Sequence, residues 1–156
     1  MKTVFWIAST GGHLRQMLGL SPIFGKYDSY LITEKTDSTM KLKQEYGKRC
    51  RFVVSSSRAH FFIYLLKFSF VCIQSFILFL RFRPDYVITT GTHTAVPFCY
   101  IAHFFGKKVI YIETRSSFHK ITWAGRIISR FADLFVVQRR SLLGLIPNAV
   151  LCEVEE

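Results

Sequence analysis

Apolar residues recur along this chain in short continuous runs, and the segments between the runs show a helical spacing of apolar positions. The runs are rich in Val, Ile and Phe and do not alternate with polar residues, which is typical of parallel strands buried on both faces of a sheet. They predict strands over residues 4–8, 29–32, 51–55, 86–89, 108–112 and 134–137. Helices are predicted between them, over residues 13–20, 38–46, 60–81, 95–105 and 123–131. This alternation predicts an α/β fold with one parallel sheet and right-handed crossovers.

The chain is predicted to form one domain. Its 156 residues match the size of a single α/β unit, and no repeat, low-complexity segment or linker interrupts the alternation. We therefore expect a single Rossmann-like domain over residues 1–156. Residues 145–156 contain a Pro-Asn turn, a short apolar run and an acidic end. Either an edge strand or a tail that binds a partner fits this last segment.

Two turns rich in glycine, histidine and hydroxyl side chains each connect a predicted strand to a predicted helix. They are Ser9-Thr10-Gly11-Gly12-His13 and Thr89-Thr90-Gly91-Thr92-His93-Thr94. In the common doubly wound strand order 3-2-1-4-5-6, the first and fourth strands are neighbours, and ligands bind outside their carboxyl ends. The sequence therefore predicts a functional cleft that both turns form together.

The chemistry of these turns suits a phosphate. Gly11 and Gly12 permit backbone dihedrals closed to other residues and place no Cβ in the way of a ligand. The helix that follows offers free N–H groups and the positive end of its dipole. The alternative is a glycine turn needed only for tight packing, because no third glycine completes the dinucleotide fingerprint. The expected phosphate-binding residues are Ser9, Thr10, Gly11, Gly12, His13, Gly91, Thr92, His93 and Thr94.

The loop after the fifth strand lies beside this cleft and adds a carboxylate and a guanidinium. Glu113 ends an apolar run, so its carboxylate is expected to be half-buried and to need a partner, and Arg115 suits bidentate phosphate contact. Alternatively, Glu113 simply pairs with Arg115 to fix the loop. His13 and His93 can serve as acid–base or hydrogen-bonding groups, and His13 is the candidate catalytic residue. No residue cluster has metal-ligand spacing, so we expect neither a metal nor a cofactor.

Composition indicates an anionic partner. The formal net charge is +11, from 21 Lys and Arg against 10 Asp and Glu, and 50% of the residues are hydrophobic, with 16 Phe among them. Such a surface attracts anionic lipid or diphosphates. We expect no nucleic-acid partner, because the aromatic residues lie in apolar runs and no known nucleic-acid motif is present. The four scattered cysteines predict reduced core residues of a cytosolic protein.

Residues 61–80 are apolar and long enough to span a membrane, since about 20 helical residues cover roughly 30 Å. A spanning helix here would put consecutive strands on opposite sides of the bilayer. We therefore favour a crossover helix that packs on the sheet, carries a stripe of Lys67, Gln74 and Arg81, and contacts an anionic leaflet. A helix fully buried in the core is the alternative. The expected membrane contacts are Phe61, Phe62, Leu66, Lys67, Phe70, Arg81 and Arg83.

Four motifs occur in an order that resembles one family. They are Ser9-Thr10-Gly11-Gly12-His13-Leu14, Gly91-Thr92-His93-Thr94-Ala95-Val96-Pro97, Tyr111-Ile112-Glu113-Thr114-Arg115 and Ala132-Asp133-Leu134-Phe135-Val136-Val137-Gln138. The set resembles the membrane-associated subunit of the two-component N-acetylglucosaminyltransferase of the dolichol pathway. It is similar, too, to bacterial galactosyltransferase enhancers of capsule and exopolysaccharide synthesis. This resemblance implies the fold of the N-terminal half of a GT-B glycosyltransferase.

The resemblance also implies a function. Such a subunit binds a lipid-linked sugar acceptor at the membrane, while a separate catalytic subunit, the GT-B C-terminal half, holds the nucleotide-sugar donor. For this chain it implies bacterial polysaccharide synthesis on a polyprenyl-diphosphate-linked acceptor at the cytoplasmic face of the plasma membrane. The first strand begins almost at Met1, so attachment is expected from residues 61–80 and their basic flanks. The alternative is a self-sufficient small enzyme that binds a nucleotide sugar in the same cleft.

The end of the chain is expected to dock the catalytic subunit. About nineteen residues follow the last predicted strand, too few for a second α/β domain. They carry more apolar side chains than a solvated tail should. The expected docking residues of the tail 142–156 are Leu142, Leu145, Ile146, Val150, Leu151 and Val154.

Overall fold

The computed structural model describes residues 1–55 and 61–152, and within them one parallel sheet has the strand order β3-β2-β1-β4-β5-β6-β7. The strands are β1 (Thr3–Ile7), β2 (Asp28–Glu34), β3 (Cys50–Val53), β4 (Tyr86–Thr89), β5 (Lys108–Ile112), β6 (Leu134–Val137) and β7 (Val150–Leu151). Each neighbouring pair is parallel. The order reverses between β1 and β4, which confirms the predicted switch point and the single α/β domain.

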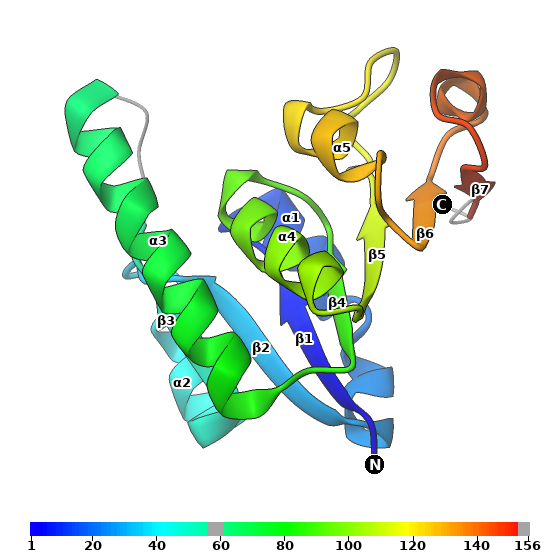
Figure 1. Cartoon of the computed structure of the whole chain (residues 1–156). Coiled ribbons are helices and arrows are strands. Elements are labelled where there is room, and N and C mark those ends of the chain that lie inside the picture. The colour runs from blue at the N-terminus through cyan, green and yellow to red at the C-terminus, as the bar shows by residue number, and fades with distance from the viewer. Residues whose placement is uncertain (56–60, 153–156) are drawn as a thin grey trace.

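Helices cover both faces of the sheet (Figure 1). One face carries α3 (Phe61–Phe82), α4 (Val96–Phe104) and α5 (Trp123–Ile128), and the other carries α1 (Gly12–Leu18) and α2 (Lys41–Tyr46). Short 3₁₀ helices complete the connections: η1 (Ser21–Lys26), η2 (Gly47–Arg49), η3 (His93–Ala95) and η4 (Arg140–Leu145). Several predicted helices are longer than those observed, because their ends form turns instead.

The central strand β1 explains why the strands read as continuous apolar runs. Its residues point alternately to the two faces, so Phe5 and Ile7 join the core under α3 and α4, while Val4 and Trp6 join the core under α1. All four side chains are almost fully buried. A strand covered on both faces has no exposed position where a polar side chain would be favoured.

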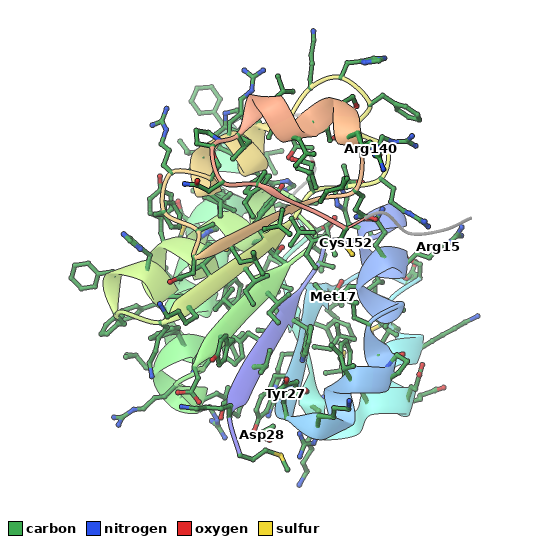
Figure 2. The ribbon with its side chains drawn as sticks, turned by 90° about the vertical axis from the view of Figure 1, so that its right-hand side faces the viewer. Arg15, Met17, Tyr27, Asp28, Arg140 and Cys152 are labelled. Carbon is green, nitrogen blue, oxygen red and sulfur yellow. The ribbon has the colours of Figure 1, made fainter. Side chains whose placement is uncertain are left out.

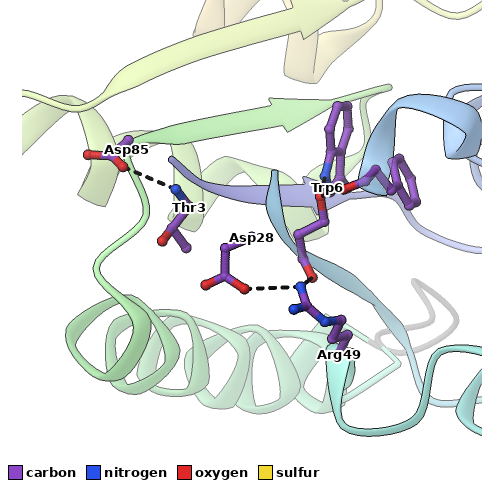
Figure 3. A network of polar contacts seen from close by, with 7 residues as sticks. Thr3, Trp6, Asp28, Arg49 and Asp85 are labelled. Carbon is purple, nitrogen blue, oxygen red and sulfur yellow. Dashed lines mark hydrogen bonds and ion pairs between the residues drawn. The ribbon is translucent and has the colours of Figure 1, made fainter. Parts of the chain in front are cut away.

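Polar contacts fix the strands at the amino edge of the sheet (Figure 3). The amide of Thr3 donates to Asp85 Oδ2 at 3.1 Å, and this bond lowers the pKa of the Asp85 carboxyl. Arg49 forms an ion pair with Asp28 at 3.0 Å, which links η2 to the start of β2. This edge lies opposite the predicted cleft, so its carboxylates are suitable controls for those at the carboxyl edge.

Helix α3 packs on the sheet along one side only. Val71, Ser75 and Phe79 are buried, and Gln74 Oε1 accepts a hydrogen bond from the Val54 amide at 3.0 Å. Gln74 of the predicted polar stripe therefore faces the end of β3, whereas Arg81 is exposed. The segment Phe62–Phe82 is long and apolar enough to cross a membrane, and 17% of its most apolar window is buried. The alternative of a fully buried helix is therefore wrong.

The end of the described chain forms an edge strand, as one of the two interpretations predicted. Val150 and Leu151 of β7 pair with Val136 and Val137 of β6. The cysteines do not all fit the expectation of core residues. Cys50 and Cys99 are buried, but Cys152 is exposed, since it follows the short strand β7 at the edge of the sheet.

Candidate functional site

The turns after β1 and β4 are joined at the switch point by a pair of hydrogen bonds. His13 Nδ1 lies 2.7 Å from the Thr90 carbonyl oxygen, and Thr90 Oγ1 donates to the His13 carbonyl oxygen at 2.9 Å. A carbonyl oxygen can only accept, so the proton of the neutral imidazole is on Nδ1. The nitrogen that can gain or lose a proton is therefore Nε2.

Glycine occupies these positions of the turns for different physical reasons. Gly91 has φ 105°, and a Cβ there would lie 2.8 Å from the Tyr111 hydroxyl, so tight packing requires glycine at this position. Gly11 has φ 70° and ψ −135°, a conformation that side chains disfavour. A Cβ on Gly12 would meet nothing within 4 Å among the described residues. The packing alternative thus explains Gly91 but not Gly12, whose open side is available to a ligand.

Thr92 is strained. It has φ 91° and ψ 161°, a region that non-glycine residues occupy at a cost of about 1–3 kcal/mol. Its Oγ1 is buried and has no hydrogen-bond partner in the described part of the chain. Strain of this kind persists only where the surrounding structure fixes the backbone, and it occurs most often in functional loops.

Glu113 is fully buried at the end of β5. One carboxylate oxygen accepts from the Thr114 amide at 3.0 Å and from Ser117 Oγ at 3.3 Å, and the other accepts from the Thr122 amide and hydroxyl at 3.2 and 3.1 Å. Its partners here are thus amides and hydroxyls of its own loop, not the Arg115 guanidinium. A Cβ on Gly125 would collide with this carboxylate, so glycine keeps the space open.

Burial raises the pKa of Glu113, and the hydrogen bonds from Thr114, Thr122 and Ser117 oppose this rise. The folded chain therefore holds this proton more tightly than the unfolded chain does. The contribution of the group to the free energy of unfolding is complete below the pKa of the unfolded carboxyl. It is lost as the pH rises through the higher pKa of the folded state.

A groove of about 570 Å³ opens between α1 and the ends of β4, β5 and β6. Arg15 lies on its α1 side and Cys152 on the facing side, after β7 (Figure 2). Ile112 and Val136 give it an apolar floor, and Arg115 adds a second guanidinium. The groove can therefore hold an anion next to an apolar group. The remaining lining residues are Gly12, Gln16, Gly19, Leu20, Thr90, Thr114, Ser116 and Gln138.

Sequence reasoning missed several residues of this region. Arg15 and Gln16 carry no motif signal. Gln138 ends the fourth motif, but the sequence assigns it no role in the site; its Nε2 donates to the Glu113 carbonyl oxygen at 2.7 Å. Glu34 is a second buried carboxylate, at the end of β2, close to His93 and Thr94. Thr33 separates Glu34 from the apolar run before it, so the signal that singled out Glu113 is weaker at Glu34. Among residues 1–55 and 61–152, no group of His, Cys, Asp and Glu is arranged to hold a metal ion.

The predicted membrane contacts lie mostly on the open side of α3. Phe62, Leu66 and Phe70 are 78%, 65% and 58% exposed, whereas Lys67 is half-buried. Arg81 and Arg83 are exposed at the other end of the helix. Phe104 of α4, which the sequence did not single out, is 84% exposed. The side chain of Phe61 lies outside the described part of the structure.

The predicted docking residues divide into two groups. Leu142 and Ile146 are buried in the core under η4, so they support the fold. Leu145 and Val150 are exposed and Leu151 is half-buried, next to the edge of the sheet. Val154 lies outside the described residues.

A family model described as "Oligosaccharide biosynthesis protein Alg14 like" matches residues 4–152. The chain belongs to this family. An Alg14 of Rattus norvegicus, named UDP-N-acetylglucosamine transferase subunit ALG14, is 30% identical over 175 residues, which cover 92% of this chain and 78% of that protein. The protein of the same name from Mus musculus is 37% identical over 82 residues, which cover 49% of this chain and 38% of that protein.

Solved structures confirm the fold of this Alg14-like chain. MurG of Acinetobacter baumannii superposes with a TM-score of 0.80 at 16% identity, over 100% of this chain and 47% of that one. UDP-N-acetylglucosamine 2-epimerase of Rickettsia bellii gives a TM-score of 0.70 at 15% identity, over 97% and 44% of the two chains. The Alg14-like chain thus spans about half the length of these proteins, as expected for one half of a GT-B fold.

Proposed function

We propose that this Alg14-like chain is the accessory subunit of a membrane-associated glycosyltransferase. In this proposal it binds a polyprenyl-diphosphate-linked sugar acceptor, and a separate catalytic subunit supplies the nucleotide-sugar donor. The observation that carries the proposal is the joining of the two glycine turns by His13 and Thr90, at the switch point of a sheet that is half a GT-B fold. The name of the rat relative, a UDP-N-acetylglucosamine transferase subunit, supports the same role.

The diphosphate of the acceptor binds at the turns Gly11–His13 and Gly91–Thr94 in this proposal. The open side of Gly12 and the guanidinium groups of Arg15 and Arg115 in the groove favour an anion there. The remaining predicted residues, Ser9, Thr10 and Glu113, shape the same edge of the sheet. The apolar floor of the groove suits the uncharged part of a ligand.

Membrane attachment is proposed through the open side of α3. Its 22 residues extend for about 33 Å and expose large apolar side chains along most of that length, with Arg81 and Arg83 at one end. Such a surface favours a helix lying in the interface of an anionic leaflet. The N-terminal end of α3 lies near the carboxyl edge of the sheet, because Tyr64 contacts His93. A lipid-linked acceptor would therefore reach the cleft directly from the membrane.

The catalytic subunit is proposed to dock near the end of the described chain, where Leu145, Leu151 and Val150 lie around the sheet edge. The relatives reported above are eukaryotic proteins, so they support the subunit role alone. The capsule or exopolysaccharide setting, and the cytoplasmic face of the plasma membrane, stay predictions of the sequence resemblance.

The test is sugar transfer by the complex of this chain with its catalytic subunit. Gly12→Val places a side chain in the open space of the first turn and should lower transfer at least a hundredfold, with fold and partner binding intact. Gly25→Val is the matched control, because a Cβ on Gly25 also meets nothing among the described residues and Gly25 lies in η1, away from the cleft. Normal transfer by the Gly12→Val complex would exclude the site. Transfer by the purified chain alone would contradict the accessory role.

A further inference from the structure

Glu34 is a buried carboxylate that joins three elements at the carboxyl edge of the sheet. It ends β2 and is 6% exposed. Its Oε2 accepts from Ser55 Oγ, beyond β3, at 3.1 Å, and its Oε1 accepts from Thr94 Oγ1 in η3. Hydroxyl groups satisfy its lone pairs but do not balance its charge, and a buried charge is costly unless a cation lies close.

His93 can supply that cation. Its Nε2 lies 3.8 Å from Glu34 Oε1, and its side chain is 15% exposed. The ring also contacts the ring of Tyr64 on α3, with the centroids 5.7 Å apart. Glu34 from β2 and Tyr64 from α3 are thus two titratable groups that face the imidazole. A carboxylate and an aromatic ring thus both lie against the imidazole of His93.

The backbone before His93 is strained in a way that fits this placement. Thr92 keeps its unfavourable conformation because hydrogen bonds fix the chain on either side of it: the Gly91 amide donates to Thr89 Oγ1, and Thr94 Oγ1 donates to Glu34. Strain maintained by neighbouring contacts is a recurrent feature of groups that must be held in place for a reaction.

The other candidate histidine, His13, has no such carboxylate partner among residues 1–55 and 61–152. The contact of His13 Nδ1 is with the neutral carbonyl of Thr90. A neutral acceptor orients an imidazole but stabilises its protonated form much less than a carboxylate at 3.8 Å does. Of the two histidines, His93 therefore has the surroundings of a proton acceptor.

We propose that His93 is the proton acceptor of the transfer reaction and that Glu34 is its positioning residue. This rests on the proposed function. The acceptor hydroxyl gives its proton to the His93 imidazole, and its oxygen forms a bond to the anomeric carbon of the donor sugar. The bond between that carbon and the nucleoside diphosphate breaks, and the electron pair leaves with the diphosphate. The Glu34 carboxylate stabilises the imidazolium that forms.

The test compares pH–rate profiles of the complex with its catalytic subunit. His93→Gln should lower kcat about a hundredfold or more, because general base catalysis is typically worth 10²–10⁴. Glu34→Gln keeps the shape and can still bond Thr94 and Ser55, but it removes the charge. It should lower kcat about tenfold and move the acid limb of the profile to lower pH, because the imidazolium loses its stabilising neighbour. Asp28→Asn is the control, because it removes a carboxylate at the opposite edge of the sheet. It should change neither kcat nor the acid limb of the profile.

The outcomes separate this inference from the proposed function. If the wild-type complex transfers sugar but Glu34→Gln keeps both kcat and the acid limb, the inference is overturned and the proposed function stands. If the wild-type complex is inactive, the proposed function fails first. The isolated chain gives an independent readout by NMR. The His93 ring signals should titrate at lower pH in Glu34→Gln than in the wild type, while those of His13 stay unchanged; an unchanged His93 titration overturns the pairing. Circular dichroism verifies that each variant is folded.

Discussion

Helices α3 and α4 pack against each other on one face of the sheet, and both are apolar along their length (Figure 1). In α4, most side chains are buried, including Phe98, Cys99 and Ala102. In α3, the described side chains that are buried are Val71, Ser75 and Phe79. The difference is position. Helix α4 lies between α3 and α5, whereas α3 lies at the outer side of the layer and is too long for the strands beneath it.

This comparison shows that apolar composition can mean two different things in one molecule. The apolar residues of α4 stabilise the fold, because folding removes them from water. The exposed apolar side chains of α3 stay in water unless a partner or a membrane covers them. Contiguous exposed apolar surfaces mark interaction sites. The aromatic contact of Phe105 with Phe76, both of them exposed, continues this surface from α3 to the end of α4.

The largest effect on stability is expected in α4. Phe98 is fully buried, and its ring packs edge-on against Phe5 with the centroids 6.1 Å apart. Phe98→Ala should lower the free energy of unfolding by about 3–5 kcal/mol, measured by urea denaturation. Phe70→Ala in α3 is the matched control and should change it by less than about 0.5 kcal/mol. Equal losses from the two variants would mean that the two helices do not differ in role.

The next effect concerns lipid binding by α3. Replacing Phe62, Leu66 and Phe70 with Ser should weaken co-sedimentation with anionic vesicles about a hundredfold, because each removed side chain buries apolar area in the interface. Salt should weaken binding of the wild type, since the basic residues act through screened charge. Ile23→Ser and Met40→Ser alter exposed apolar residues of the opposite face and should have no effect. A wild-type chain that stays in the supernatant at low salt would contradict the lipid interaction.

A smaller effect on stability is expected where α3 meets the sheet. Gln74→Ala leaves the Val54 amide without its acceptor, which should cost about 1–3 kcal/mol and speed hydrogen exchange of that amide. Ser69→Ala is the control, because Ser69 is exposed and bonds within its own helix. If Gln74→Ala is as neutral as Ser69→Ala, the helix is not fixed to the sheet by this bond.

The smallest effect is expected from the exposed end of α4. Phe104→Ser should weaken vesicle binding about threefold, since one side chain at the margin of the apolar surface inserts less deeply than those of α3. Its thermal unfolding midpoint should equal that of the wild type. A large loss of stability would assign Phe104 to the core, together with the rest of α4.

The sequence predicted the sheet and the cleft because their signals are local. Continuous apolar runs mark strands that are buried on both faces, and glycine, histidine and hydroxyl residues after the first and fourth runs mark the turns there. A parallel sheet with helical crossovers then brings the two turns together, as the bonds between His13 and Thr90 confirm. Glu113 was found for the same reason, since a carboxylate that ends an apolar run is visible without the fold.

Other features depend on contacts between distant parts of the chain. Glu34 and Thr94 are 60 positions apart, so no local pattern shows that they meet beside His93. Leu142 and Ile146 look like docking residues in the sequence, yet η4 turns them into the core.

The sequence by itself determined which segments are apolar, which turns carry the chemistry and in what order they follow one another. Only the tertiary structure decided which apolar side chains are covered, that Gln74 faces the sheet, and that a buried carboxylate lies next to His93. The physical reason is that burial and charge pairing depend on neighbours supplied by other elements. The sequence of α3 shows a polar stripe, but only the packed layer decides which side of the helix lies against the sheet.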